Sequence, residues 1–100
     1  MGLNERFRFY RYEPGQRFAP HFDGSYRREN GEESYVTLLL YLNNECEGGQ
    51  TRIEVPEGTY EVQPETGLAL LFLHRLLHEG APVTSGVKYV LRTDIMFESN

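Results

Sequence analysis

The sequence predicts an all-β domain, a double-stranded β-helix (jelly roll) of about eight short strands with few or no helices. Short runs of β-branched, leucine and aromatic residues alternate with Gly, Pro and Asn, and no stretch keeps the apolar period of an amphipathic helix. The 100 residues are 39% hydrophobic and 25% charged, and no repeat, linker or low-complexity tract divides them. We therefore expect one soluble domain over residues 1–100.

In the N-terminal half we expect strands over residues 6–13, 18–22 and 35–42. The first alternates Phe7 and Phe9 with polar side chains, which is the period of a half-buried strand. The second ends at a His-Phe-Asp segment, and the third is a nearly continuous apolar run. The polar stretch 25–34 between them predicts a loop that borders a functional site.

In the C-terminal half we expect strands over residues 51–55, 59–63, 68–73, 77–83 and 86–97. The last is long and rich in β-branched and aromatic residues. Lys88 follows His78 by ten residues, so we expect their two strands to be neighbours across a tight connection.

The charge distribution bears on the partners of the chain. The formal net charge is −5, which argues against a protein that coats nucleic acid. Residues 1–28 are nevertheless basic, with six arginines against three acidic residues. A solvated strand face is one interpretation of these arginines, and a basic rim that receives an acidic substrate is the other.

Cys46 is the one cysteine, so no intramolecular disulfide can form, and a reducing compartment is indicated. We interpret Cys46 as a thiol in a polar loop. The longest apolar runs, 38–42 and 67–73, have the length of strands rather than membrane spans, and no signal peptide is evident at the N-terminus. These features predict a cytoplasmic protein without a membrane partner.

His21 and Asp23 are two residues apart, so on an extended segment their side chains point to the same side. Together with a later histidine, His78, they can occupy three adjacent corners of an octahedron. Two imidazoles and one carboxylate in this arrangement leave three positions open and are typical of non-haem Fe(II) sites.

His74 competes with His78 for this role, because histidines four apart on a helix can share one zinc ion. Arg75 stands where such a motif carries its glutamate, and the preceding run is typical of a strand. We therefore choose His78 as the ligand and expect His74 to lie at the surface or behind a ligand.

Lys88, Val90, Arg92 and Asp94 share one face of the last predicted strand. If this face is buried, its two cations need an anion, and a dicarboxylate would provide one. If the face is solvated, Tyr89 and its neighbours form the core instead.

These residues lie in segments that resemble the Fe(II)- and 2-oxoglutarate-dependent dioxygenases, specifically the prolyl 4-hydroxylase-like branch. The similar segments are, in order, Arg11–Gln16, Phe18–Asp23, Thr37–Asn43, Gly48–Thr51 and His78–Lys88. Their common order makes the resemblance far more specific than any one segment, and it covers nearly the whole chain.

The resemblance implies that His21, Asp23 and His78 bind iron and that Lys88 pairs with the distal carboxylate of 2-oxoglutarate. Tyr12 would donate its hydroxyl to the same carboxylate, and Tyr41 is a second candidate phenol donor. Arg92 departs from the collagen-type pattern and either helps to hold the carboxylate or pairs with Asp94. The implied cofactors are Fe(II), the cosubstrate 2-oxoglutarate and O2, with ascorbate as a further reductant.

The resemblance implies hydroxylation of a protein side chain such as proline, or of a small molecule, with decarboxylation of 2-oxoglutarate to succinate. A non-catalytic cupin-like module that binds a metal or a small acid is the alternative. A nucleic-acid demethylase of the same superfamily is less similar, because that branch places paired arginines further along the last strand.

Members of this family usually carry N-terminal helices over the outer face of the larger sheet. The residues before Arg6 leave no room for such helices. We therefore expect either a homodimer through an uncovered sheet face or a trimmed catalytic core.

Overall fold

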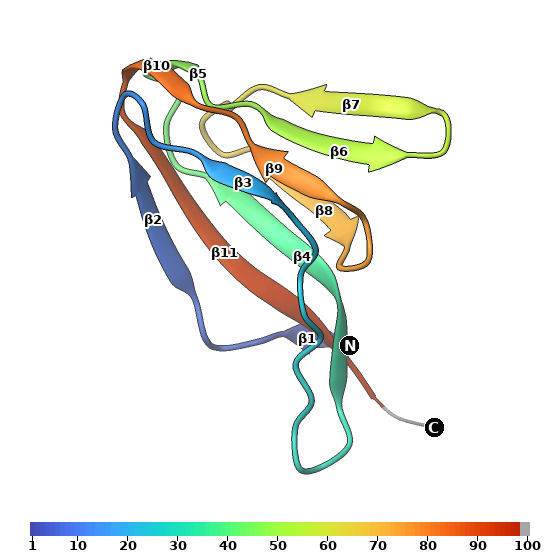
Figure 1. The fold of residues 1–100 in the computed structure, drawn as a ribbon. Helices are drawn as coiled ribbons and strands as arrows, with labels where there is room; N and C mark the ends of the chain where they lie inside the picture. Colours follow the sequence, from blue (N-terminus) through green and yellow to red (C-terminus); the bar gives the residue numbers. More distant parts are fainter. Residues whose placement is uncertain (99–100) are drawn as a thin grey trace.

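In the computed structural model, which describes residues 1–98, the chain forms two facing layers of β-strands (Figure 1). The described residues contain eleven strands and no helix, and accordingly no helix in them has the length and apolarity to cross a membrane. The strands are β1 (Gly2–Leu3), β2 (Arg8–Tyr12), β3 (Phe18–His21), β4 (Glu33–Tyr41), β5 (Cys46–Gly48), β6 (Thr51–Val55), β7 (Gly58–Val62), β8 (Ala69–Leu73), β9 (His78–Gly80), β10 (Val83–Gly86) and β11 (Lys88–Phe97).

The larger sheet is built around β11, which pairs with β4 on one side and with β1 and β2 on the other. All of these pairs are antiparallel, and β8 extends the sheet beyond β4. Since side chains alternate along a strand, Lys88, Val90 and Arg92 point toward the second layer. Lys88 and Val90 are buried, so of the two alternatives for this face the structure shows the buried one.

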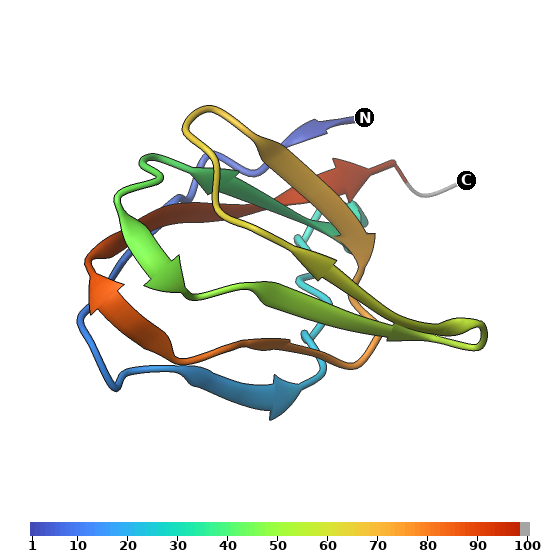
Figure 2. The same cartoon turned by 90° about the horizontal axis from the view of Figure 1, so that it is seen from above.

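The second layer is a sheet with the strand order β3-β9-β6-β7, and β5 and β10 form a separate antiparallel pair. From above, β4 and β11 run along one side of the molecule, and β3, β6 and β9 run along the other (Figure 2). Buried apolar side chains from both layers form a small core, among them Tyr41, Ile53, Phe72, Val83, Val90 and Met96. This architecture confirms the predicted all-β jelly roll.

The outer face of the larger sheet is apolar and exposed. Phe9 lies opposite Leu91, and Leu71 lies opposite Leu38, on the side that points away from the second layer. Phe9 is 59% exposed and Leu71 is 52% exposed. Within residues 1–98 no other element covers this face.

The structure corrects the predicted strands in three places. It adds the short strands β1, β5 and β10 to the eight predicted ones, so Cys46 begins a strand rather than lying in a loop. It also divides the predicted strand 77–83, because Pro82 has no backbone N–H for a ladder. Finally, β9 and β11 lie in different sheets, so the strands of His78 and Lys88 are not neighbours.

Candidate metal centre and its pocket

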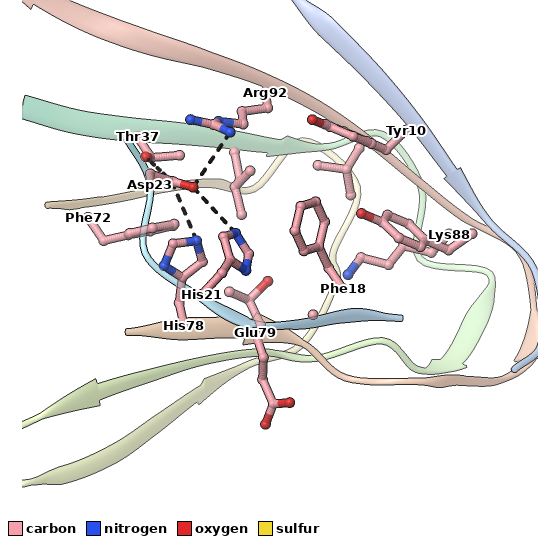
Figure 3. Close-up of a pocket in the computed structure, with 15 residues that line it drawn as sticks. Tyr10, Phe18, His21, Asp23, Thr37, Phe72, His78, Glu79, Lys88 and Arg92 are labelled. Carbon is pink, nitrogen blue, oxygen red and sulfur yellow. Dashed lines mark hydrogen bonds and ion pairs between the residues drawn. The ribbon is translucent and has the colours of Figure 1, made fainter. Parts of the chain in front are cut away.

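Three potential metal ligands converge between the two layers. His21 in β3 lies directly opposite His78 in β9, and Asp23 follows two residues after His21. The Nε2 atoms of His21 and His78 each lie 3.4 Å from an oxygen of the Asp23 carboxylate. Each of the three residues offers one potential ligand atom, and these three atoms lie within 4.8 Å of one another (Figure 3). The structure therefore brings together the three residues that the sequence singled out.

Hydrogen bonds to the backbone orient both imidazoles. The Nδ1 atom of His21 lies 2.7 Å from the carbonyl oxygen of Ala19, and that of His78 lies 2.8 Å from the carbonyl oxygen of Leu76. A carbonyl only accepts, so each Nδ1 carries a hydrogen, and each Nε2 is turned toward Asp23. Without a proton or cation between them, these nitrogen lone pairs would face the carboxylate lone pairs, so the donor set fits a divalent metal such as iron.

A chain of hydrogen bonds supports Asp23 from behind. The hydroxyl of Thr37, on β4, donates to Asp23 at 2.5 Å and must therefore accept from Nδ1–H of His74, at 2.7 Å. The Nε2 atom of His74 then accepts a hydrogen bond from the Ser34 hydroxyl at 2.9 Å. The oxygen of this hydroxyl in turn accepts from the backbone N–H of Tyr26. His74 is thus a buried residue behind a candidate ligand, which is one of the two positions expected for it.

The charges around Asp23 keep it ionised. Burial by itself raises the pKa of Asp23, but the neighbouring His78 imidazole, the hydrogen bond from Thr37 and the charge of Arg92 lower it well below its ordinary value overall. Arg92 lies 3.6 Å from Asp23 and 3.3 Å from Asp94. The pairing of Arg92 with Asp94 is one of the two alternatives that the sequence left open.

Lys88 lies at the opposite end of the same pocket from Arg92 (Figure 3). Its side chain is buried, and within residues 1–98 no carboxylate lies within the 4.0 Å of an ion pair. The ammonium group instead faces the rings of Tyr12 and Tyr41, at 5.1 and 6.0 Å from their centroids. Burial lowers the pKa of Lys88 to about 8. A buried cation without an anionic partner is a natural site for an acidic ligand.

The turn at Gly48 and Gly49 packs against the aliphatic part of Lys88. Both glycines have positive φ angles, 73° and 70°, which other residues rarely adopt. A Cβ atom at Gly49 would lie 3.1 Å from Cδ of Lys88. The glycine pair therefore lets the turn approach and position the lysine.

Two tyrosines predicted to serve this end of the pocket differ in position. Tyr12 lines the pocket, and its burial raises its pKa to about 12. Tyr41 is fully buried, and its hydroxyl bonds to the hydroxyl of Thr51 rather than facing the pocket. Thr51 itself lines the pocket, so the polar group presented there belongs to a residue that sequence reasoning did not select.

Aromatic side chains that the sequence analysis did not select complete the pocket. Phe18 stacks on His21 with ring centroids 4.1 Å apart, and Phe72 lies 4.5 Å from the His78 ring. Tyr10 lies next to Tyr12 on the same face of β2 and also lines the pocket. The spacing of two residues between Tyr10 and Tyr12 was the available signal for Tyr10.

The fold and the site together define a jelly-roll protein with two histidines and one carboxylate beside a buried lysine. The sequence profile of the 2OG-Fe(II) oxygenase superfamily matches residues 7–93. The chain belongs to this superfamily.

Similar proteins include several hydroxylases. A PKHD-type hydroxylase of Paraburkholderia phymatum is 36% identical over 86 residues, which cover 80% of this chain and 38% of that protein. A prolyl-4-hydroxylase of Pseudomonas putida aligns with a TM-score of 0.73 and 30% identity over 94% of this chain and 54% of that one. A viral collagen prolyl hydroxylase of Paramecium bursaria Chlorella virus-1, in complex with 2OG, gives a TM-score of 0.67 and 26% identity over 95% and 63% of the two chains. The chain thus spans only 38% of the length of the curated relative from P. phymatum.

Proposed function

We propose that this chain is the oxygenase domain of an Fe(II)- and 2-oxoglutarate-dependent hydroxylase, and that it acts on a protein side chain, with proline as the first candidate. The observation that carries the proposal is the buried, unpaired Lys88 in the same pocket as His21, Asp23 and His78. The names of the two similar prolyl hydroxylases, from P. putida and the Chlorella virus, support proline as the target.

His21, Asp23 and His78 would hold the iron. Bound iron supplies the redox chemistry that couples O2 and 2-oxoglutarate to hydroxylation of a C–H bond, with release of succinate and CO2. We propose O2 as the second cosubstrate and ascorbate as a further reductant.

The other pocket residues have distinct roles in this proposal. Lys88 binds the distal carboxylate of 2-oxoglutarate, with Tyr12 beside it and the hydroxyl of Tyr41 held behind by Thr51. For Arg92, of the two roles that the sequence left open, we propose the pairing: it balances the charges of Asp23 and Asp94. The ring of Phe18, stacked on His21, shields one face of that ligand.

The test is the release of succinate after addition of Fe(II) and 2-oxoglutarate under air, with and without proline-containing peptides. We expect succinate from the parent chain and none from Asp23→Ala. A non-catalytic binding module would retain 2-oxoglutarate, as seen by titration calorimetry, and release no succinate.

We also propose that two copies of this domain associate through the exposed outer face of the larger sheet, around Phe9 and Leu71. Sedimentation velocity at micromolar concentration should show a dimer, and Phe9→Ser should shift it to the monomer. A monomer that binds no hydrophobic dye contradicts this proposal.

The cytoplasm stays our predicted location, and the unpaired Cys46 supports it.

A further inference from the structure

A second cavity, of about 450 Å³, adjoins the metal end of the pocket. The two cavities share Arg92, whose guanidinium lies 3.6 Å from Asp23. The loop that directly follows Asp23 forms part of the wall. The residues lining this cavity, here called the arginine cleft, are Asn4, Glu5, Arg6, Arg8, Gly24, Ser25, Tyr26, Arg92, Thr93 and Asp94.

The arginine cleft presents like charges to one another. Arg8 lies directly opposite Arg92 on the neighbouring antiparallel strand, so both side chains lie on the same face of the sheet. Like charges in this position destabilise a strand pair. Arg92 is balanced by Asp23 and Asp94, whereas the side chain of Arg8 makes no ion pair or hydrogen bond within residues 1–98. One cation in the cleft therefore lacks a partner.

Arg6 adds a second such cation at a defined place. The hydroxyl of Thr93 lies 2.8 Å from the carbonyl oxygen of Asn4 and 3.0 Å from that of Arg6, and Asn4 also bonds to the backbone of Asp94. These bonds hold the segment before β2 against β11. The side chain of Arg6, like that of Arg8, has no ion-pair partner within the described part of the chain.

The position of the cleft matches the side from which a substrate would come. In the proposed function, 2-oxoglutarate occupies the pocket between the metal ligands and Lys88, so the substrate needs a different approach. The arginine cleft lies beyond Arg92, at the opposite end from Lys88, and its lining includes Gly24, which directly follows the candidate ligand Asp23.

We propose that the arginine cleft binds an aspartate or glutamate side chain of a peptide substrate, close in sequence to the residue that is hydroxylated. This inference rests on the proposed function and specifies its substrate class. A single carboxylate suits the cleft better than a nucleic acid does, because Glu5 and Asp94 line it too and would repel a string of phosphates.

The test compares two short fluorescein-labelled peptides, each with one central proline, flanked by glutamates in one and by glutamines in the other. Binding to the full chain with Fe(II) and 2-oxoglutarate under argon is followed by fluorescence anisotropy. We expect the glutamate peptide to bind about three- to fivefold more tightly, which is the upper part of the range for one exposed ion pair. The preference should shrink as salt is added.

Arg8→Glu should remove the preference, and Arg17→Glu is the matched control, since Arg17 is exposed and lies outside the cleft. Arg8→Glu also places opposite charges across β2 and β11, so its melting temperature should equal or exceed that of the parent. Arg8→Gln removes the charge without creating a new pair and should abolish the preference as well.

Three results would overturn the inference: equal affinity for the two peptides, equal loss of the preference in Arg8→Glu and Arg17→Glu, or stronger competition by a single-stranded oligonucleotide than by the glutamate peptide. Succinate release separates this inference from the proposed function. If both peptides give equal amounts of succinate, the proposed function is supported and the preference for an acidic substrate is refuted. If the glutamate peptide binds selectively but no peptide gives succinate, the proposed function is refuted and the binding site is supported.

Discussion

The two ends of the pocket differ in whether their buried charge has a partner. At the metal end, the Asp23 carboxylate contacts Thr37 and Arg92 as well as both imidazoles. At the other end, the ammonium group of Lys88 is buried against two tyrosine rings and has no anionic partner within residues 1–98. The charge of Asp23 is thus met by groups of the protein itself, whereas the charge of Lys88 has no counterpart in the described residues.

The buried charge of Lys88 lowers the stability of the free protein. Burial lowers the pKa of Lys88 from 10.5 to about 8, which corresponds to about 3 kcal/mol of destabilisation of the charged form in the free protein. A ligand carboxylate meets a cation that has already lost most of its water. We therefore expect the stability lost in the free fold to reappear as affinity for the ligand.

The largest expected effect is at the metal end. Replacement of His21, Asp23 or His78 by alanine removes one of three ligands and should reduce 2-oxoglutarate turnover below detection. His74→Ala removes only support behind Asp23, so measurable activity should remain. Oxygen consumption with Fe(II) and 2-oxoglutarate checks this prediction, and activity that survives His78→Ala but not His74→Ala would reverse the choice of ligand.

At the lysine end we expect Lys88→Met to weaken 2-oxoglutarate binding by roughly 1.5 to 3 kcal/mol, the range for a hydrogen bond to a charged group. The same change should stabilise the free protein in urea unfolding at pH 7, because it removes a buried charge. Iron affinity should stay unchanged. If calorimetry shows no loss of 2-oxoglutarate affinity, Lys88 is not the anchor.

The lowered pKa of Lys88 should make the stability of the protein depend on pH. Between about pH 8 and 10.5 the unfolded chain holds this proton more tightly than the folded chain, so the free energy of unfolding should rise with pH in this window, by up to about 1.4 kcal/mol per unit. Below pH 8 the burial penalty is fully present. The difference in stability between Lys88→Met and the parent should therefore shrink across the same window in paired urea titrations, and a constant difference contradicts the shifted pKa.

A smaller effect is expected at the turn that positions the lysine. Gly49→Ala introduces a Cβ 3.1 Å from Cδ of Lys88 at a φ of 70°, and should cost about 1 kcal/mol or more of stability. It should also weaken 2-oxoglutarate binding without changing iron affinity. Gly15→Ala is a suitable control, since its φ is also positive but nothing lies within 4 Å of the added atom.

Alternation along strands made much of this site predictable. The rule that residues two apart share a face was sufficient to predict that His21 and Asp23 lie together and that Lys88 and Val90 lie on one face. Whether that face is buried could not be decided from alternation, because it depends on the second layer of strands. It did not foresee that the Tyr41 hydroxyl is taken by Thr51, because that contact joins two sheets and depends on their packing. The short strands β5 and β10 were missed for a related reason, since their pairing depends on how the chain folds back on itself.

The place of β11 in the larger sheet has a consequence for the order of assembly. This strand follows all the others in residues 1–98, yet β1, β2 and β4 all pair with it. During synthesis, the segment with His21 and Asp23 emerges from the ribosome before the segment with Lys88 and Arg92 has been made. The pocket can therefore close only late. Most native contacts thus join distant parts of the sequence, which is typical of slow folding. We therefore expect the domain to be most prone to aggregation before β11 is made, while the edges of β2 and β4 are still unpaired.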